Sequence, residues 1–225
     1  MTSIFRRAMG PVFERLHPEL RRRFDVGVEE RRGCVGTGVM DRVWHSPLVR
    51  PFLLAGAARN VLVPDSGRNV PFRIENLPYV DSHGRETVTF VRTFELPRRT
   101  RRFDATMVYD AAGGRIVDFL GSCQHLATDL AFSDDGAGGL VIRSGELRFS
   151  EGWVSCRVPR LITGRAVVRE SYDEGSGRFR IRVTVANPRF GPLFGYRGTF
   201  AAAYVDMAEH GVPARVKPRR EQARL

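Results

Sequence analysis

Several charged residues lie inside alternating strand patterns, on the same side as apolar residues. An unpaired charge inside a protein costs several kcal/mol, so any of these side chains that point into a core must pair or bind something. The alternative is that the whole set faces solvent or forms internal ion pairs. These candidate ligand-binding residues are Glu86, Arg92, Asp118 and Glu146, set beside the apolar residues Phe90, Ile116, Leu120 and Ile142.

Two further titratable residues, His125 and Asp129, share one face of an expected strand. Four residues of extended chain separate their α-carbons by about 13 Å. This is too far for a direct acid–base pair unless the strand bulges. Both are candidate ligand-binding residues.

The segment 187–198 combines glycines and prolines with large apolar side chains. Its composition predicts no regular central strand, yet it is too apolar for a free loop. One interpretation is an aromatic rim at the mouth of a pocket, where Arg189 or Arg197 meets an anionic group. The other is a packed corner between the last two strands. The candidate ligand-binding residues here are Phe190, Phe194, Tyr196 and Arg197.

A run of arginines follows Pro97, at an expected turn between two strands. Guanidinium groups in such a cluster suit phosphate or an anionic lipid headgroup. The alternative is a solvated turn in an arginine-rich chain. The candidate anion-binding residues are Arg98, Arg99, Arg101 and Arg102.

These residues are positioned by a chain that reads mainly as β-structure. In the stretch 124–149 two alternating runs flank an Asp/Gly-rich turn, which predicts a β-hairpin. Similar hairpins before and after it predict an antiparallel meander of about nine strands over 34–207. A sheet of that size tends to curl or close, so we expect a β-rich α+β fold forming a barrel or half-barrel.

The early part of the body is more irregular. We expect the first strand over 33–45, with the Gly36–Gly38 pair inside it and not in a dinucleotide-binding loop, because a helix does not follow. A short helix is expected over 48–58. The stretch 60–81 reads as loop-rich, with one short strand near 72–75.

Both ends of the single domain, 1–225, differ from the body. An apolar stripe over 1–33, broken at Pro11 and Pro18, predicts two or three short helices packed on the sheet as a lid, with the basic run Arg21–Arg23 on a solvated face. A membrane-surface arm with the basic run Arg21–Arg23 is the alternative. The basic tail, 208–225, is expected to be frayed.

The net charge of +11 and the pI near 10.8 raise nucleic acid and anionic membranes as partners. No aromatic residues interleave with the basic ones as a stacking platform, so we do not expect nucleic acid. Only Lys217 among the 36 basic residues is a lysine, a skew that also follows from genomic base composition. The chain has no apolar run near 20 residues and no signal peptide, so we expect it in the cytoplasm, with peripheral membrane contact as an alternative.

The three cysteines match neither a disulfide framework nor zinc spacing, so we expect no metal site and no cofactor.

One resemblance covers most of the chain. The segments 63–81, 84–97, 118–130, 138–149 and 187–200, with RFDATM at 102–107, resemble the bacterial family of domains of unknown function numbered 4166. Members occur alone or fused behind a saccharopine-dehydrogenase-like reductase domain. The resemblance therefore implies work beside a nicotinamide-dependent reductase, and it implies no site residues.

The sequence leaves three functions open. The leading hypothesis is an accessory module that holds a small apolar or amphipathic ligand inside the barrel. The second is an enzyme acting on such a ligand, with Glu86, Asp118, His125 or Asp129 as the acid or base. The third is peripheral binding to anionic membrane or nucleic acid through the arginine clusters.

Overall fold

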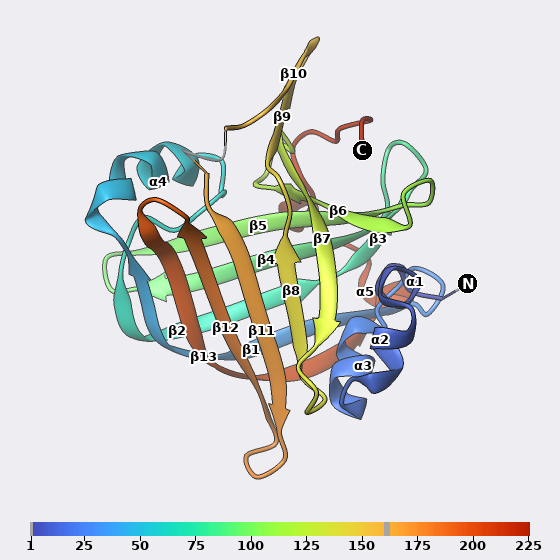
Figure 1. The fold of residues 1–225 in the computed structure, drawn as a ribbon. Coiled ribbons are helices and arrows are strands. Elements are labelled where there is room, and N and C mark those ends of the chain that lie inside the picture. Colours follow the sequence, from blue (N-terminus) through green and yellow to red (C-terminus); the bar gives the residue numbers. More distant parts are fainter. Residues whose placement is uncertain (1, 160–162) are drawn as a thin grey trace.

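The protein forms a closed ten-stranded antiparallel barrel. The structure, a computed structural model, describes residues 2–159 and 163–225. Each strand of the ring pairs with its neighbour along the chain, and closure comes from the β1–β13 and β7–β8 ladders (Figure 1). The ring strands are β1 (Arg32–His45), β2 (Gly67–Asn76), β4 (Glu86–Leu96), β5 (Arg99–Asp110), β6 (Arg115–Leu120), β7 (Leu126–Asp134), β8 (Leu140–Ser144), β11 (Arg165–Asp173), β12 (Arg178–Asn187) and β13 (Gly191–Asp206).

The predicted β-rich barrel built as a meander is confirmed, and the half-barrel alternative is not what forms. The described residues contain 13 strands against about nine expected. Ten form the ring, and β3 (Pro78–Val80), β9 (Arg148–Glu151) and β10 (Val154–Arg157) lie outside it. The expected second run of the 124–149 hairpin is in fact two strands. Of these, β8 closes the barrel, whereas β9 forms a projecting hairpin with β10.

Alternation along the strands separates a buried inner face from a solvated outer one. In β7, Leu126, Thr128 and Leu130 line the interior, as the alternating pattern predicts. In β12, Phe179, Ile181 and Val183 are buried, and the arginines between them face outward.

The prediction for 60–81 placed a strand correctly near 72–75 but made it too short, because β2 runs for ten residues through Pro71. Pro71 pairs with Val39 of β1, but the ladder to β4 begins only at Phe72. Pro71 therefore lies just outside the β4 ladder, at a position where a sheet tolerates proline.

The prediction that 187–198 cannot be a central strand was wrong. β13 begins at Gly191 and pairs with both β1 and β12. Pro192 pairs only with Ala186, beyond the end of the β1 ladder, and a register shift between Val185 and Ala186 absorbs the irregularity.

A bulge in β1 reverses the expected sidedness of one residue. Val35 and Val39 face outward, but the register shift between Met40 and Arg42 makes Asp41 the extra residue. Val43 is therefore buried, on the opposite face from the one its parity predicts.

Three short helices close one end of the barrel, as predicted for a lid. They are α1 (Ile4–Met9), α2 (Pro11–Arg15) and α3 (Pro18–Phe24), with Pro11 and Pro18 each at a helix start. Their apolar stripe, including Phe5, Phe13 and Phe24, belongs to the main core. Burial of that stripe fixes the lid on the strand ends.

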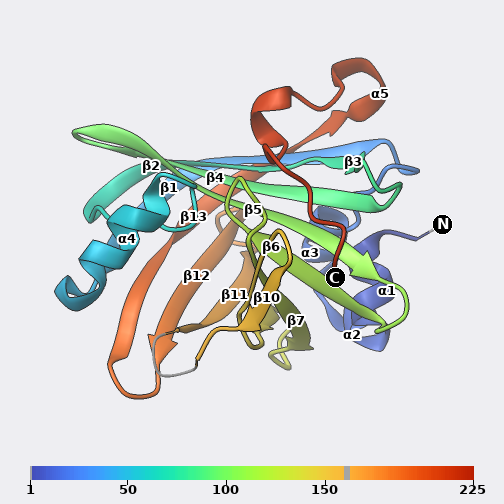
Figure 2. The ribbon, with the colours of Figure 1, turned by 90° about the horizontal axis from the view of Figure 1, so that it is seen from above.

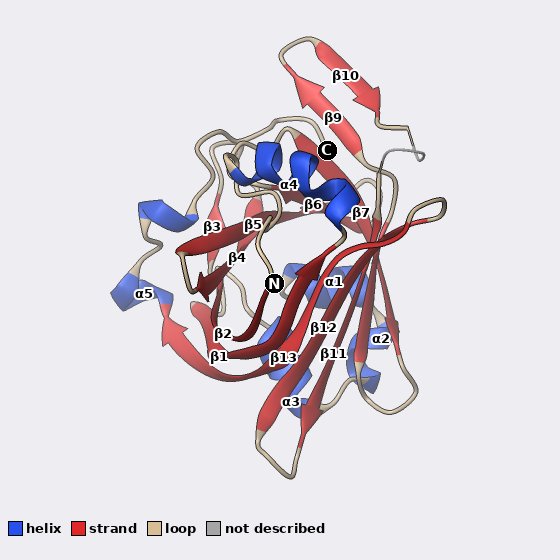
Figure 3. Ribbon diagram, turned by 90° about the vertical axis from the view of Figure 1, so that its left-hand side faces the viewer, coloured by secondary structure: helices blue, strands red, loops and turns tan. Residues whose placement is uncertain are grey.

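The 3₁₀ turn η1 (Pro47–Val49) and helix α4 (Arg50–Ala57) follow β1, away from α1–α3 (Figures 1 and 3). This agrees with the helix expected over 48–58. Within the described residues, no helix has the length and hydropathy needed to cross a bilayer.

The C-terminal tail lies along the outside of the sheet, where we expected frayed chain (Figure 2). It follows α5 (Met207–His210) and includes the turn η2 (Ala214–Val216). Arg215 donates hydrogen bonds of 2.7 and 2.8 Å to the buried carboxylate of Glu75, and the Gln222 amide donates to Gln124 at 2.6 Å. Composition alone predicted disorder because these carboxylate and amide partners are distant in sequence.

Candidate functional site

The barrel encloses a cavity of about 550 Å³ that reaches the surface at the end carrying α4. This is the volume range of pockets that hold small organic ligands. Leu48 and Phe190 line the cavity and are also 71% and 52% exposed, so they mark its mouth. Most of the wall is apolar, with contributions from Leu53, Val61, Leu62, Phe103, Leu120, Leu126, Ile142, Leu147, Leu193 and Phe194.

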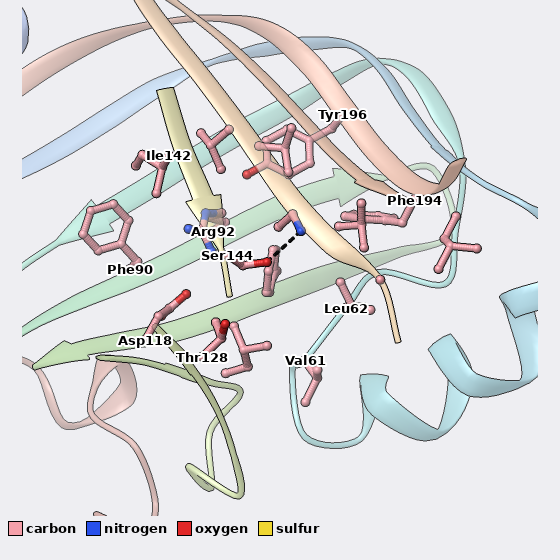
Figure 4. A pocket seen from close by; sticks show the side chains of 18 of the residues that line it. Val61, Leu62, Phe90, Arg92, Asp118, Thr128, Ile142, Ser144, Phe194 and Tyr196 are labelled. Atoms are coloured by element: carbon pink, nitrogen blue, oxygen red, sulfur yellow. Dashed lines mark hydrogen bonds between the residues drawn. The ribbon is translucent and has the colours of Figure 1, made fainter. Parts of the chain in front are cut away.

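Arg92 of β4 and Asp118 of β6 bring opposite charges into this apolar cavity (Figure 4). Arg92 is 8% exposed and lies over the Phe103 ring at 4.6 Å. Its guanidinium makes no ion pair or hydrogen bond within the described part of the chain, and Nη1 is a buried donor without a partner. Arg92 is therefore a cation held by aromatic faces, with its donors unused.

The Asp118 carboxyl is also without a hydrogen-bond partner at Oδ1 among the described residues. Burial raises the pKa of Asp118 to about 7, and the nearby charge of Arg92 opposes that rise only in part. The group therefore changes its protonation state near neutral pH, unlike an ordinary surface aspartate.

The hydroxyl of Tyr196 on β13 also faces the cavity and has no hydrogen-bond partner in the described part of the chain. Burial raises the pKa of Tyr196, which keeps the phenol protonated as a donor. Thr128 and Ser144 add hydroxyls to the wall, although Ser144 Oγ already accepts from the Ala166 amide at 2.8 Å (Figure 4).

A buried ion pair forms the cavity floor next to the helical lid. Arg23 of α3 donates to both carboxylate oxygens of Glu170 on β11, and its Nη1 donates to Asn76 Oδ1 at 2.6 Å. Burial raises the pKa of Glu170 while the charge of Arg23 opposes that rise. The solvated basic face expected for Arg21–Arg23 is therefore wrong for Arg23, which is 1% exposed.

The structure divides the ten predicted ligand-binding residues into two equal groups. Arg92, Asp118, Phe190, Phe194 and Tyr196 line the cavity. The other five, Glu86, His125, Asp129, Glu146 and Arg197, do not line it.

Glu86 has the inward parity of β4 but lies at the closed end, where it accepts from Arg7 at 2.7 Å and from the Val28 amide at 3.2 Å. The N-terminal segment therefore satisfies this carboxylate, away from the cavity lining.

The remaining members of the second group face outward or lie in loops. Asp129 pairs with Arg115 at 2.8 Å and with Arg148 at 2.7 Å, and His125 pairs with Glu151. Glu146 lies 3.3 Å from Arg157. Arg197 follows Tyr196 directly, so alternation alone places it on the outer face.

The predicted anion-binding run does not form a single turn. Arg98 lies between β4 and β5, whereas Arg99, Arg101 and Arg102 belong to β5. Arg101 pairs with Asp65 at 2.5 Å, and Arg102 pairs with Asp104 at 2.9 Å. Two of the four guanidinium groups therefore already have carboxylate partners.

Sequence reasoning did not place Arg23 or Glu170 in the cavity. One signal was available, because Glu170 shares the inward parity of Val168 and Tyr172 on β11. No signal in the sequence joined it to a residue 147 positions earlier.

With this geometry established, the chain can be compared with other proteins. The family model described as "Domain of unknown function (DUF4166)" matches residues 16–200. The chain belongs to this family. It is also 32% identical over 201 residues to an uncharacterized protein, YndH, of Bacillus subtilis (strain 168), a match that covers 89% of this chain and 97% of the relative. No solved structure matches the chain significantly.

The matched region includes every ring strand, apart from the end of β13, and helix α3 with Arg23. The resemblance expected from the sequence is thus confirmed, whereas the implied reductase partner stays a prediction. In the described ranges 2–159 and 163–225, no group of three or more His, Cys, Asp or Glu side chains is arranged to hold a metal ion.

Proposed function

We propose that the barrel is a binding module for a small amphipathic ligand. The observation that supports this is one cavity of about 550 Å³ with an apolar wall and three buried polar groups, those of Arg92, Asp118 and Tyr196, that have no hydrogen-bond partner among the described residues. A buried polar group without a partner costs about 1–3 kcal/mol. A bound ligand that supplies the missing partners recovers that free energy.

The distribution of lining residues gives the ligand a direction. Its polar end lies deep in the barrel against Arg92 and Asp118, and its hydrocarbon extends past Phe194 toward Leu48 and Phe190 at the mouth. The unused donors of Arg92 favour a carboxylate or another oxygen acceptor as the polar group. The expected class is therefore a medium-sized amphiphile with one oxygen-rich end.

Native mass spectrometry of the intact protein, followed by organic extraction, tests this directly. We expect a mass adduct of one small molecule that is lost in Arg92→Met, and displacement of that molecule by a fluorescent fatty acid. Arg98→Met is the matched control because Arg98 is exposed outside the barrel. A wild-type protein with no adduct and no fatty-acid binding contradicts the proposal.

A second candidate function is acid–base catalysis on the same ligand, and one observation favours it. Of the four residues expected to act as acid or base, only Asp118 lines the cavity, and its pKa of about 7 suits proton transfer near neutral pH. Tyr196 adds a protonated donor in the same space.

The Asp118→Asn variant distinguishes catalysis from binding alone. Catalysis predicts that wild-type protein converts the extracted molecule to a product visible by liquid chromatography, while Asp118→Asn binds it unchanged. A pure binding module leaves the molecule intact in both proteins.

A further inference from the structure

A row of five arginines crosses the outer face of the barrel, on the opposite side of the sheet from the interior cavity. Each lies directly opposite the next in the ladders that join β2, β1, β13, β12 and β11. All five side chains are exposed. In order across the sheet they are Arg68, Arg42, Arg197, Arg182 and Arg169, which we call the arginine row.

The five positive charges of the arginine row repel one another when no anion lies between them. Side chains directly opposite each other in antiparallel strands have β-carbons about 4.5–5.5 Å apart, and like charges there repel. Within the described chain, none of the five makes an ion pair or a side-chain hydrogen bond. By contrast, Arg180 on the same face of β12 pairs with Asp173 at 2.6 Å. The lack of partners is therefore a property of the row and not of arginine in this sheet.

The middle of the row borders a surface hollow of about 220 Å³. Arg42, Arg182 and Arg197 surround it together with Trp44 and Thr184, and none of the described carboxylates lines it. Val183 and Tyr196 complete the lining, and because their side chains face the interior they contribute backbone. Asp41, the exposed bulge residue beside Arg42, is not part of the lining.

The hollow depends on Gly195, which lies in register between Trp44 and Thr184. A β-carbon at Gly195 would fall 2.8 Å from Cζ2 of Trp44 and 2.6 Å from the Val183 carbonyl oxygen. Glycine at this position therefore leaves room for the Trp44 indole, which forms one wall of the hollow. The site thus combines three cationic side chains, one aromatic wall and one hydroxyl.

We infer that this hollow is a binding site for a multiply charged phosphate group of the pyrophosphate type. Arg197 at the centre and Arg42 and Arg182 on either side supply forked donors that match phosphate oxygens. Thr184 supplies a further donor, and Trp44 packs against whatever organic part the phosphate carries. Neutralisation of the row by the anion removes the repulsion that the free protein tolerates. This site lies outside the barrel and does not depend on the proposed cavity function.

Trp44 provides the readout. The chain has two tryptophans, and Trp153 is 89% exposed, so Trp153→Phe leaves Trp44 as the sole indole without disturbing the barrel. Sodium pyrophosphate is titrated into this variant at constant total ionic strength. We expect a saturable change in Trp44 fluorescence, with affinity at least tenfold weaker in Arg197→Gln and abolished in Arg42→Gln/Arg182→Gln.

The matched control is Arg98→Gln/Arg99→Gln, which removes the same charge from exposed positions away from the hollow. An equal loss of affinity in that control, or no saturable response in the parent, overturns the proposal. Vesicles containing a phosphorylated lipid and a single-stranded oligonucleotide are titrated in parallel. Competition between such vesicles and pyrophosphate identifies a lipid headgroup as the source of the phosphate. Tighter, hollow-dependent binding of the oligonucleotide overturns the assignment to a small anion in favour of nucleic acid.

Discussion

Two buried arginines of this barrel have opposite surroundings. Arg23, at the closed end, is 1% exposed and donates to Glu170 and Asn76. Arg92, in the middle of the cavity, is 8% exposed and lies over Phe103 with unused donors. The same side chain is therefore part of a complete polar network in one place and part of an incomplete one in the other.

The difference separates a buried charge that stabilises the fold from a buried charge that is available to bind a ligand. A complete buried network is costly to break because each member leaves another uncompensated. An incomplete network already destabilises the folded protein. Removing one of its members should therefore not lower the free energy of unfolding, although it should weaken ligand binding. The exposed fraction of the side chain does not distinguish these two cases, whereas its hydrogen-bond partners do.

The largest effect is expected for Arg23→Met. Glu170 would be left buried without its cation, and breaking a buried pair in this way costs about 3–5 kcal/mol. The loss should shrink at acid pH, because the unpaired Glu170 carboxyl then takes up a proton. Urea denaturation at pH 5 and pH 8 measures both effects.

The double variant Arg23→Met/Glu170→Leu serves as the control for that loss. Replacing both partners with apolar side chains of similar size is often close to neutral, so most of the stability should return. Persistent destabilisation would mean that Asn76, and not the ion pair, organises the floor.

Asp118→Asn should have a smaller effect that depends on pH. The pKa of Asp118 is raised to about 7 in the folded protein, while an unfolded aspartate titrates near 4. Between these values the unfolded chain loses a proton that the folded protein keeps, so the stability of the wild type falls as pH rises. Asp118→Asn lacks this fall and should gain roughly 2–4 kcal/mol over the wild type at pH 8, with little difference at pH 4.

Chemical denaturation across pH 4–8 gives that difference curve. A pH-independent difference would mean that Asp118 is charged in the folded state and has a partner such as Arg92. Arg92 would then have a carboxylate partner, as Arg23 does, and the two arginines would not differ in this respect.

Arg92→Met makes the comparison direct, because it repeats the Arg23 substitution at the second site. Met fills similar volume between Phe90 and Phe103 and buries no unused donor, so the free energy of unfolding should change by less than about 1 kcal/mol. Ligand retention, followed by native mass spectrometry, should be lost. A destabilisation like that of Arg23→Met would show that Arg92 belongs to the framework.

Period-two alternation predicted the fold, and together with the unusual composition of 187–198 it predicted half of the site. Alternation correctly placed Arg92 and Asp118 toward a core, because the regular ladders of β4 and β6 preserve parity. It would also have placed Arg197 outside had it been applied to that residue. The bulge at Asp41 is where the rule fails, since one extra residue inverts every later side chain.

Other features of the site were beyond any local pattern. Glu86 has the right parity but lies at the strand end beneath Arg7, and parity does not report position along the barrel axis. The Arg23–Glu170 pair and the arginine row depend on which strands become neighbours. Ring closure sets that order through the β1–β13 ladder, which joins residues about 160 positions apart.

Tyr196→Phe is the smallest and most discriminating change. It removes one hydroxyl that is buried and unpartnered among the described residues, and leaves the ring in contact with Phe94 and Phe194. Because an unsatisfied group is removed, stability should stay constant or rise by up to about 1 kcal/mol, while affinity for the fluorescent fatty acid falls by up to about tenfold. Denaturation and probe titration on the same sample separate the two quantities. A loss of stability with unchanged affinity would mean that the Tyr196 hydroxyl stabilises the fold, as Arg23 does. Of the three polar groups proposed to bind the ligand, only Arg92 and Asp118 would then remain.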